Sequence, residues 1–327
     1  MKVHIQYGPK PEHLAILREH LHPDIQLTIG DSPPQPADFD ILVHGFPRRE
    51  DILASPRLHA LVVPWAGVPQ ETLALMKVFP DISIHNLHYN SGPTAEMAVA
   101  LLLAAAKTIV PFDRNFRRYS WASPFQDAPG GVLLEGKTAL ILGYGGVGRR
   151  VASICRALAM HVIATRRHPE PAPPDEIYGP EALPALLPQA NALILCVPHT
   201  PQTAGLIGEK ELDLLPPDPV LVNVARGPIV QEDALYRALK TRKLFAAGLD
   251  VWYRYPTQAE REPGVTVPPS SLPFHELDNV VMSPHRAGWS EETESFRSIH
   301  LAELLNAAAR GKPLPNRINL CDHIGED

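Results

Sequence analysis

The sequence predicts an α/β protein with two domains, each built on a doubly wound parallel sheet. Short apolar runs alternate with amphipathic segments over residues 1–90, and the same alternation resumes at Thr138. A glycine-rich turn follows the first apolar run of the second series. With 327 residues the chain is long enough for two domains that each bury their own core.

The composition is that of a soluble globular protein, with 45% hydrophobic and 20% charged residues. A net charge of −6 argues against nucleic acid or an anionic membrane as the main partner. The three cysteines are scattered without metal-type spacing, which favours a reduced, cytoplasmic protein. The segment Lys2–Tyr7 reads as a strand rather than a signal peptide, and the apolar run Ala95–Val110 contains Glu96 and Lys107 and is short for a membrane span.

The first series repeats a strand, a connection and a helix. Its expected strands are Val3–Tyr7, Ile25–Ile29, Asp40–His44, Ala60–Pro64 and Ile82–Asn86. Its expected helices are Pro11–Leu21, Arg48–Ala54 and Gln70–Val78. No glycine fingerprint accompanies these strands.

The pattern changes at Ser91-Gly92-Pro93-Thr94, where a chain breaker is followed by a candidate N-cap at Thr94 and a long helix over Ala95–Val110. Such a point suits a domain crossing and a hinge. The last expected helix, Glu291–Arg310, would return to the first domain. We therefore assign residues 1–92 plus 289–327 to one domain and residues 93–288 to the other.

The second series has six expected strands and three helices between them. The strands are Thr138–Leu142, Val162–Thr165, Ala192–Val197, Val220–Val224, Phe245–Val251 and Val280–Ser283. The helices are Val147–Ala159, Glu209–Leu214 and Gln231–Thr241.

The first of these strands leads into glycines spaced Gly143-x-Gly145-x-x-Gly148, and a helix follows at once. The first glycine allows a sharp turn, the second lets a pyrophosphate approach the backbone, and the third lets helix and strand pack closely. A phosphate would sit at the helix N-terminus, where free N–H groups and the dipole favour negative charge. The order of strand, glycine turn and helix predicts a Rossmann-like dinucleotide site.

The second strand of this series indicates which dinucleotide binds. A site that prefers NAD usually has a carboxylate at the end of that strand to bond the ribose hydroxyls. Here the strand ends in Thr165-Arg166-Arg167. An adenosine 2′-phosphate would find charge-assisted partners in these cations. We expect NADP(H) to be preferred and NAD(H) to be the alternative, and a basic turn without function is the other interpretation.

Three polar residues lie at the carboxyl ends of later strands of the same sheet: Arg226 and His285 follow their strands, and Asp250 is near the end of its own. Ligands of such sheets bind beyond the carboxyl ends of the strands. These side chains beside a dinucleotide turn are typical of a hydride-transfer site. The histidines show no pair with the spacing of a zinc site, so we expect no metal.

With these motifs in order, the chain resembles the D-isomer-specific 2-hydroxyacid dehydrogenases. The resemblance rests on Gly143–Gly148, Val197–Thr203, Asn223–Gly227, Gly248–Val251 and Ser283–Gly288. It implies a substrate domain made of both chain ends, a central cofactor domain, an active site in the cleft between them, and a homodimer formed through the cofactor domain.

The resemblance also implies residue roles. Arg226 would grip the carboxylate and keto oxygen of a 2-oxo acid with its planar fork, and His285 would exchange the proton. Asp250 would contact the nicotinamide carboxamide. Substrate-binding residues would be Trp65, Gly67, Val68 and Asn90. The cofactor-binding residues would be Gly143, Tyr144, Gly145, Gly146, Val147, Gly148, Thr165, Arg166, Arg167, Cys196, Val197, Pro198, Thr203, Ala225, Asp250 and Gly288.

One position departs from the resemblance. The family has a glutamate five residues after the Asp250 position, where it holds and charges the catalytic histidine, and this chain has Tyr255. A phenol can orient an imidazole but cannot stabilise an imidazolium as a carboxylate does. We expect a lower pKa for His285 than is usual in the family. Glu260 or Glu262 would replace the carboxylate only if their loop folded back onto the histidine.

The sequence therefore predicts an NAD(P)-dependent oxidoreductase that transfers hydride between nicotinamide and a small 2-oxo or D-2-hydroxy acid, similar to glyoxylate or hydroxypyruvate reductases. Formate dehydrogenases resemble this chain near Asn90 and also lack the glutamate, so a formate- or phosphite-type dehydrogenase is an alternative. A further alternative is an NAD(P)-sensing binding protein without catalysis, like the corepressors that share this fold.

Overall fold

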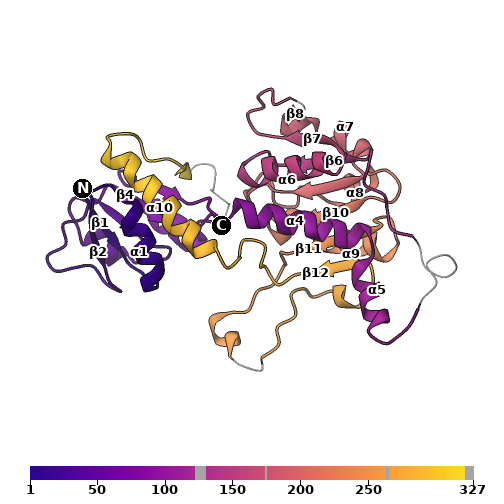
Figure 1. Ribbon diagram of the computed structural model, residues 1–327, viewed down its shortest axis with the longest axis horizontal. Coiled ribbons are helices and arrows are strands. Elements are labelled where there is room, and N and C mark those ends of the chain that lie inside the picture. The colour runs from indigo at the N-terminus through magenta and orange to yellow at the C-terminus, as the bar shows by residue number, and fades with distance from the viewer. Residues whose placement is uncertain (122–129, 174, 263–264, 321–327) are drawn as a thin grey trace. The chain divides into compact units, whose positions relative to one another are not determined.

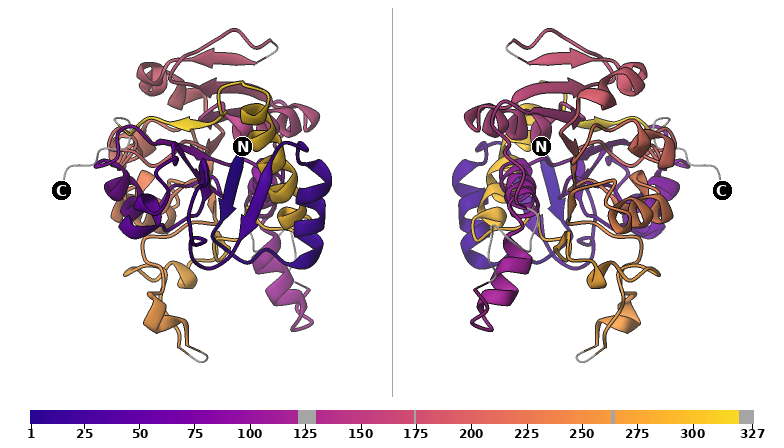
Figure 2. Two further views of the ribbon diagram at one scale, coloured as in Figure 1. Left: turned by 90° about the vertical axis from the view of Figure 1, so that its left-hand side faces the viewer. Right: turned by 90° about the vertical axis from the view of Figure 1, so that its right-hand side faces the viewer.

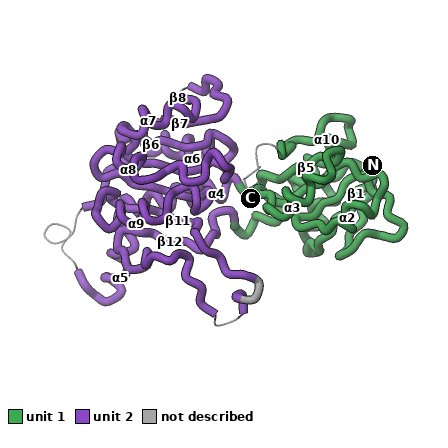
Figure 3. The backbone as a smooth tube through the Cα atoms, turned by 180° about the vertical axis from the view of Figure 1, so that it is seen from behind, with its two compact units in different colours: residues 1–90, 289–327 green, residues 91–288 purple. Residues whose placement is uncertain are grey.

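The computed structural model describes residues 1–121, 130–173, 175–262 and 265–320. The chain divides into two compact units (Figure 3). Unit 1 contains Met1–Asn90 and the chain from Trp289 onward, and unit 2 contains Ser91–Gly288. The first boundary lies two residues before the expected one, and the second lies at the expected position.

The sheet of unit 1 has the strand order β13-β5-β4-β3-β1-β2. Its strands are β1 (Lys2–Ile5), β2 (Gln26–Ile29), β3 (Ile41–Val43), β4 (Ala60–Val63), β5 (Ser83–Asn86) and β13 (Arg317–Ile318). The first five pair in parallel. The two-residue β13 runs antiparallel to β5 and was not expected, because so short a segment carries no periodic pattern.

Helices cover both faces of this sheet because its strands are apolar on both sides. On one face α1 (Pro11–His20) packs beside α10 (Thr293–Ala309), as Figure 2 shows, and both bury side chains against Val3 and Ile5. The other face, which includes Leu42 and Leu61, packs with α2 (Arg49–Leu53) and α3 (Gln70–Met76).

Unit 2 is organised around a fully parallel sheet with the order β12-β11-β10-β9-β6-β7-β8. Its strands are β6 (Thr138–Leu142), β7 (His161–Thr165), β8 (Glu176–Tyr178), β9 (Ala192–Leu195), β10 (Val220–Asn223), β11 (Ala246–Leu249) and β12 (Val280–Met282). The strand order reverses between β6 and β9. Ligands of doubly wound sheets bind at such a switch point.

The faces of this sheet are also covered by helices (Figure 1). Ile141 faces α4 (Ser91–Ala106) and α6 (Gly146–Ala157), whereas its neighbour Leu140 belongs to the core with α7 (Leu183–Leu186), α8 (Glu209–Asp213) and α9 (Glu232–Lys240). Single 3₁₀ turns complete the connections: η1 (Pro180–Ala182), η2 (Leu187–Gln189), η3 (Gly227–Ile229), η4 (Gln258–Arg261) and η5 (Phe274–Glu276).

The expected long helix over Ala95–Val110 was wrong in its bounds. The structure has α4 and then α5 (Ile109–Phe116), separated at Thr108, whose φ is 51°. Pro111 explains the break, since it has no N–H to donate to the carbonyl of Lys107 and is tolerated only in a first helical turn. Thr94 is likewise not an N-cap, because the helix already begins at Ser91.

Length and hydropathy identify no single helix among the described residues that could cross a membrane. The pair α4 and α5 meets the same criteria only together, with a bend of 66° between them.

Candidate active site

The glycine turn after β6 has the shape that the motif predicts. Gly143 has a φ of 96°, and a Cβ there would lie 2.8 Å from the backbone carbonyl of Cys196. A Cβ on Gly148 would lie 1.9 Å from the Gly143 oxygen, so only glycine lets α6 pack this closely. Beside Gly145, by contrast, a Cβ would meet no atom within 4 Å. The N-terminus of α6 is therefore open beside Gly145, where the motif would place a pyrophosphate.

The turn is tied to the end of β7. The N–H groups of Gly143 and Tyr144 both donate to the carbonyl oxygen of Thr165, at 3.1 Å each. The Tyr144 side chain is buried, and its hydroxyl donates to Asp175 at 2.5 Å. The backbone N–H and the side-chain hydroxyl of Tyr144 are therefore both bonded within the protein. Gly146 and Val147 are the first residues of α6.

The two arginines after β7 emerge next to the glycine turn, because β6 and β7 are neighbours. The Arg166 N–H donates to the Tyr178 carbonyl at 2.8 Å, and one Nη of its guanidinium lies 3.6 Å from a carboxylate oxygen of Glu170. The side chain of Glu170 is 76% exposed, so this ion pair is weak. A phosphate with greater charge would compete with Glu170 for Arg166.

The loop after β9 begins at the switch point. The Cys196 N–H donates to the Leu142 carbonyl at 2.7 Å, which joins this loop to β6. Thr203 closes the loop, since its hydroxyl donates to the Pro198 carbonyl at 2.6 Å. Val197 packs against the core. Burial raises the pKa of the Cys196 thiol to about 12, so the thiol is protonated near pH 7 and is not an activated nucleophile.

The loop after β10 presents Arg226. Asn223 folds this loop, because its amide accepts the Ala225 N–H at 3.0 Å and donates to the Arg226 carbonyl at 2.9 Å. Arg226 is exposed, and its guanidinium donates one hydrogen bond among the described residues, from Nη1 to the Ala225 carbonyl at 2.7 Å. Most guanidinium donors therefore face outward from a rigid loop.

Asp250 fixes the loop that carries His285. The Asp250 side chain is fully buried at the end of β11. Its Oδ1 accepts the Ser283 hydroxyl at 2.5 Å and the Arg286 N–H at 2.8 Å, and its Oδ2 accepts the Ala287 N–H at 2.9 Å. The nicotinamide contact predicted for Asp250 stays a prediction. The carboxylate already orders the backbone on both sides of the histidine.

His285 itself has a left-handed backbone conformation, with a φ of 58°. Such conformations cost energy in residues other than glycine and persist where surrounding bonds enforce them. Partial burial lowers the pKa of the imidazole from its ordinary value of 6.5, and the charge of Arg226 lowers it further, against an opposing effect of Asp250. Arg226 and His285 are therefore close enough to interact electrostatically.

Tyr255 contacts His285 through its ring rather than its hydroxyl. The two ring centroids lie 5.3 Å apart, and the rings are inclined by 53°. The phenol oxygen instead accepts the Trp252 N–H at 3.0 Å. Partial burial raises the pKa of this phenol from 10.0, so it is neutral near pH 7. The imidazole consequently packs against a neutral ring at this position.

The structure shows what Glu260 and Glu262 do in place of the glutamate that the family has at the Tyr255 position. Glu260 accepts hydrogen bonds from the backbone and hydroxyl of Thr257 and forms an ion pair with Arg254 at 2.6 Å. Glu262 is exposed. The interpretation in which this loop folds back onto the histidine is therefore wrong for Glu260.

The expected substrate residues of unit 1 follow β4 and β5. The Trp65 carbonyl accepts the Leu87 N–H at 3.4 Å, and the Ala66 carbonyl accepts the Asn86 amide at 2.5 Å. A trans peptide directs its N–H opposite to its C=O, so the N–H groups of Ala66 and Gly67 point away from β5. Val68 ends this turn, and Asn90 is the last residue of unit 1 before α4.

The indole of Trp65 packs within unit 1. A Cβ on Gly45 would lie 1.9 Å from this ring, and the Phe46 ring centroid lies 5.7 Å away. The indole is thus a packing group, and the substrate-binding role expected for this turn stays a prediction.

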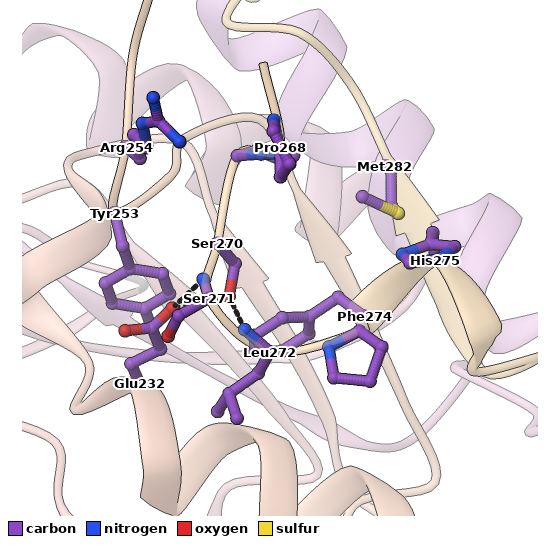
Figure 4. A pocket seen from close by; sticks show the side chains of 12 residues that line it. Glu232, Tyr253, Arg254, Pro268, Ser270, Ser271, Leu272, Phe274, His275 and Met282 are labelled. Carbon is purple, nitrogen blue, oxygen red and sulfur yellow. Dashed lines mark hydrogen bonds between the residues drawn. The ribbon is translucent and has the colours of Figure 1, made fainter. Parts of the chain in front are cut away.

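A cavity of about 550 Å³ lies on another part of unit 2 (Figure 4). Its walls include Glu232 of α9, Tyr253, Arg254 and Met282. The Glu232 carboxylate is already bonded by the Ser271 N–H at 3.3 Å and by a neighbouring serine hydroxyl. None of the predicted cofactor residues lines this cavity.

Comparison with known proteins decides the family. The model of the D-isomer specific 2-hydroxyacid dehydrogenase NAD binding domain matches residues 99–287, which is more than half of the chain. The chain belongs to this family.

Relatives within the D-2-hydroxyacid dehydrogenase family agree. A D-3-phosphoglycerate dehydrogenase of Archaeoglobus fulgidus is 37% identical over 234 residues, which cover 71% of this chain and 41% of that protein. A glyoxylate reductase of Korarchaeum cryptofilum is 36% identical over 232 residues, which cover 69% of this chain and 65% of that protein. The matches thus span less than two thirds of the length of these relatives.

A solved structure shows the same fold. The NADPH-dependent glyoxylate/hydroxypyruvate reductase of Sinorhizobium meliloti superposes with a TM-score of 0.76 at 21% sequence identity, over 98% of this chain and 99% of that chain.

Within the family architecture, the structure brings Arg226, Tyr255 and His285 together, and it adds positioning residues that the sequence did not indicate. Trp252 donates its indole N–H to the Ser283 carbonyl at 2.8 Å and its backbone N–H to Tyr255. Asn223 could have been identified as a turn former directly after a buried strand. Ser283 and Trp252 carry no such signal.

The described residues contain no group of three or more side chains suited to a metal ion.

Proposed function

We propose that the protein is an NADPH-dependent reductase of small 2-oxo acids such as glyoxylate or hydroxypyruvate, which forms D-2-hydroxy acids reversibly. The observation that carries this proposal is the placement of Arg226 and His285 on loops that follow β10 and β12, held by Asn223 and Asp250, in the sheet that carries the glycine turn. The glyoxylate reductases among the relatives support the substrate class.

Each side chain has a definite task in this proposal. A bound nicotinamide supplies the hydride. Arg226 binds the substrate carboxylate and keto oxygen, because its outward donors suit a planar bidentate acceptor and keep their charge at any working pH. His285 donates its proton to the oxygen that becomes the hydroxyl, and it accepts that proton in the reverse reaction.

The proposal is tested by mixing the purified protein with NADPH or NADH and a panel of 2-oxo acids, and with oxidised cofactor and formate or phosphite. Consumption of NADPH with a 2-oxo acid supports the reductase. Turnover with formate or phosphite alone would establish the alternative dehydrogenase, which needs no proton acceptor for formate. Tight cofactor binding without any turnover would establish a sensing protein.

The neutral ring of Tyr255 beside His285 leads to a prediction for the pH dependence of kcat/KM. Reduction requires protonated His285, and the pKa of His285 is lowered, so kcat/KM for reduction falls as the pH rises through a midpoint below 6.5. Tyr255→Glu places a carboxylate beside the imidazole and favours its charged form, which moves this midpoint upward by about one unit or more. The pH profile of kcat/KM, compared among the wild type, Tyr255→Glu and Tyr255→Phe, measures the effect.

Tyr255→Phe is the matched control, since it keeps the ring against His285 and removes only the hydroxyl bond to Trp252. A wild-type midpoint well above 6.5 that Tyr255→Phe leaves unchanged would contradict this account.

The preference for NADPH is part of the proposal, and Arg166 provides its test. Arg166→Gln removes a charge-assisted bond to the 2′-phosphate and lowers kcat/KM for NADPH about tenfold to a hundredfold. The value for NADH stays nearly constant because NADH has no 2′-phosphate. Arg237→Gln, on α9 and paired with Glu209, is the control that changes neither value. If the wild type clearly preferred NADH, the proposed preference for NADPH would be refuted.

We also propose a homodimer. Ile109 and Phe116 on α5 are 50% and 54% exposed, and Trp121, which packs edge-on against Phe116, is 84% exposed. Large exposed apolar side chains gathered at one end of unit 2 are typical of a protein interface.

A further inference from the structure

The loop between β7 and β8 carries the arginines that the proposed NADPH preference requires. It runs from Arg166 to Asp175, and at its start the Arg166 N–H is bonded to the Tyr178 carbonyl. Pro169, Pro171 and Pro173 restrict the backbone torsions between these ends. The position of the cations therefore depends on how both described ends of this loop are anchored.

The far end is anchored by a buried carboxylate. The side chain of Asp175 is 1% exposed. Its Oδ2 accepts the hydroxyl of Tyr144 at 2.5 Å and also a guanidinium N–H of Arg156. The Asp175 N–H donates to the Ala172 carbonyl at 3.0 Å, which ties Asp175 to the described part of the loop. The carboxylate charge is thus compensated through Oδ2, whereas the buried Oδ1 has no hydrogen-bond partner among the described residues.

The two donors come from the phosphate-binding elements. Tyr144 lies between Gly143 and Gly145 in the glycine turn, and its side chain is 7% exposed. Arg156 lies in the last turn of α6, the helix whose N-terminus would face the pyrophosphate. Asp175 therefore connects the loop that carries the arginines to the glycine turn, through Tyr144, and to the C-terminal end of α6, through Arg156.

We propose that Asp175 and Tyr144 are positioning residues for cofactor selection, which hold Arg166 and Arg167 where the 2′-phosphate of NADP binds. This inference rests on the proposed NADPH preference. The glycine motif itself does not require this role of Tyr144, because in such motifs backbone N–H groups bind the pyrophosphate.

Comparison of the two cofactors distinguishes a positioning role from a general effect on stability. NADPH and NADH share the pyrophosphate and the nicotinamide and differ only in the 2′-phosphate. A change that moves only the loop weakens the contacts that NADPH makes and NADH lacks. A change that disrupts the glycine turn or unfolds the protein weakens both.

The test compares Tyr144→Phe and Asp175→Asn with the wild type in kcat/KM for NADPH and for NADH, at a saturating concentration of an active 2-oxo acid. Both substitutions keep the shape of the side chain. Arg156→Gln is avoided, because it would leave the Asp175 charge buried and uncompensated. Tyr253→Phe is the matched control, since Tyr253 is a half-buried tyrosine of the same unit whose hydroxyl bonds the Val230 carbonyl at 2.9 Å.

We expect each test variant to lower the ratio of kcat/KM for NADPH over NADH by about tenfold, through KM for NADPH and with little change in kcat. Tyr253→Phe leaves the ratio unchanged even where it lowers the melting temperature. An equal loss with both cofactors, or an unchanged ratio in folded variants, overturns the inference. The wild-type ratio alone decides the proposed preference, so the two failures are distinguishable.

Discussion

Arg226→Gln is expected to lower kcat/KM for a 2-oxo acid by about a thousandfold, because it removes two charge-assisted hydrogen bonds of about 2 kcal/mol each. Arg226 is suited to this test. Its guanidinium is exposed and among the described residues bonds only the adjacent Ala225 carbonyl, so we expect the fold not to depend on it. Steady-state kinetics measure kcat/KM, and a thermal unfolding curve measures the melting temperature, which shows whether the fold is retained.

Arg226→Lys separates charge from geometry. Lysine keeps the positive charge and loses the planar fork, so we expect an intermediate loss of activity. An unchanged melting temperature is expected for both variants. A loss in Arg226→Gln of less than about tenfold would show that this guanidinium does not bind the substrate.

His285→Asn is expected to lower kcat for 2-oxo acid reduction by about a hundredfold to ten-thousandfold, because the reaction loses its proton donor. Asparagine tolerates the left-handed backbone at this position, where φ is 58°, better than most residues do. The bonds from Asp250 to the neighbouring N–H groups of Arg286 and Ala287 involve only backbone and remain available.

His275→Asn serves as the control, since His275 is an exposed histidine on η5 that pairs only loosely with Glu276, at 4.0 Å. Its kcat should equal that of the wild type. If His285→Asn retained most of the wild-type kcat for a 2-oxo acid, the proton would have another donor. Retained formate oxidation in this variant would favour the alternative dehydrogenase.

The fold was predictable because its strands are buried on both faces. Runs such as Ala139–Leu142 and Ala192–Leu195 are almost wholly apolar, and parallel strands covered by helices require such runs. The failures have local causes. The strand β13 is too short to show a pattern, and the helix through Ala95 was extended past Thr108 because Pro111 was not recognised as a first-turn residue.

The candidate site was predictable only in part. The positions of Arg226 and His285 follow from the rule that ligands meet the ends of parallel strands. Which group each side chain contacts depends on loop conformation. The sequence could not show that the Tyr255 hydroxyl oxygen accepts the Trp252 N–H while the Tyr255 ring packs against His285. Nor could it show that Tyr144 bonds to Asp175, a residue 31 positions away.

The central claim is the transfer of hydride between NADPH and the second carbon of a 2-oxo acid. Its most direct measurement uses NADPH labelled with deuterium at the transferring position, with glyoxylate or hydroxypyruvate, and analyses the product by mass spectrometry and NMR. We predict one deuterium on the second carbon and, for a chiral product, the D configuration. Oxidised cofactor without label in the product, or no reaction despite tight NADPH binding, would contradict the account.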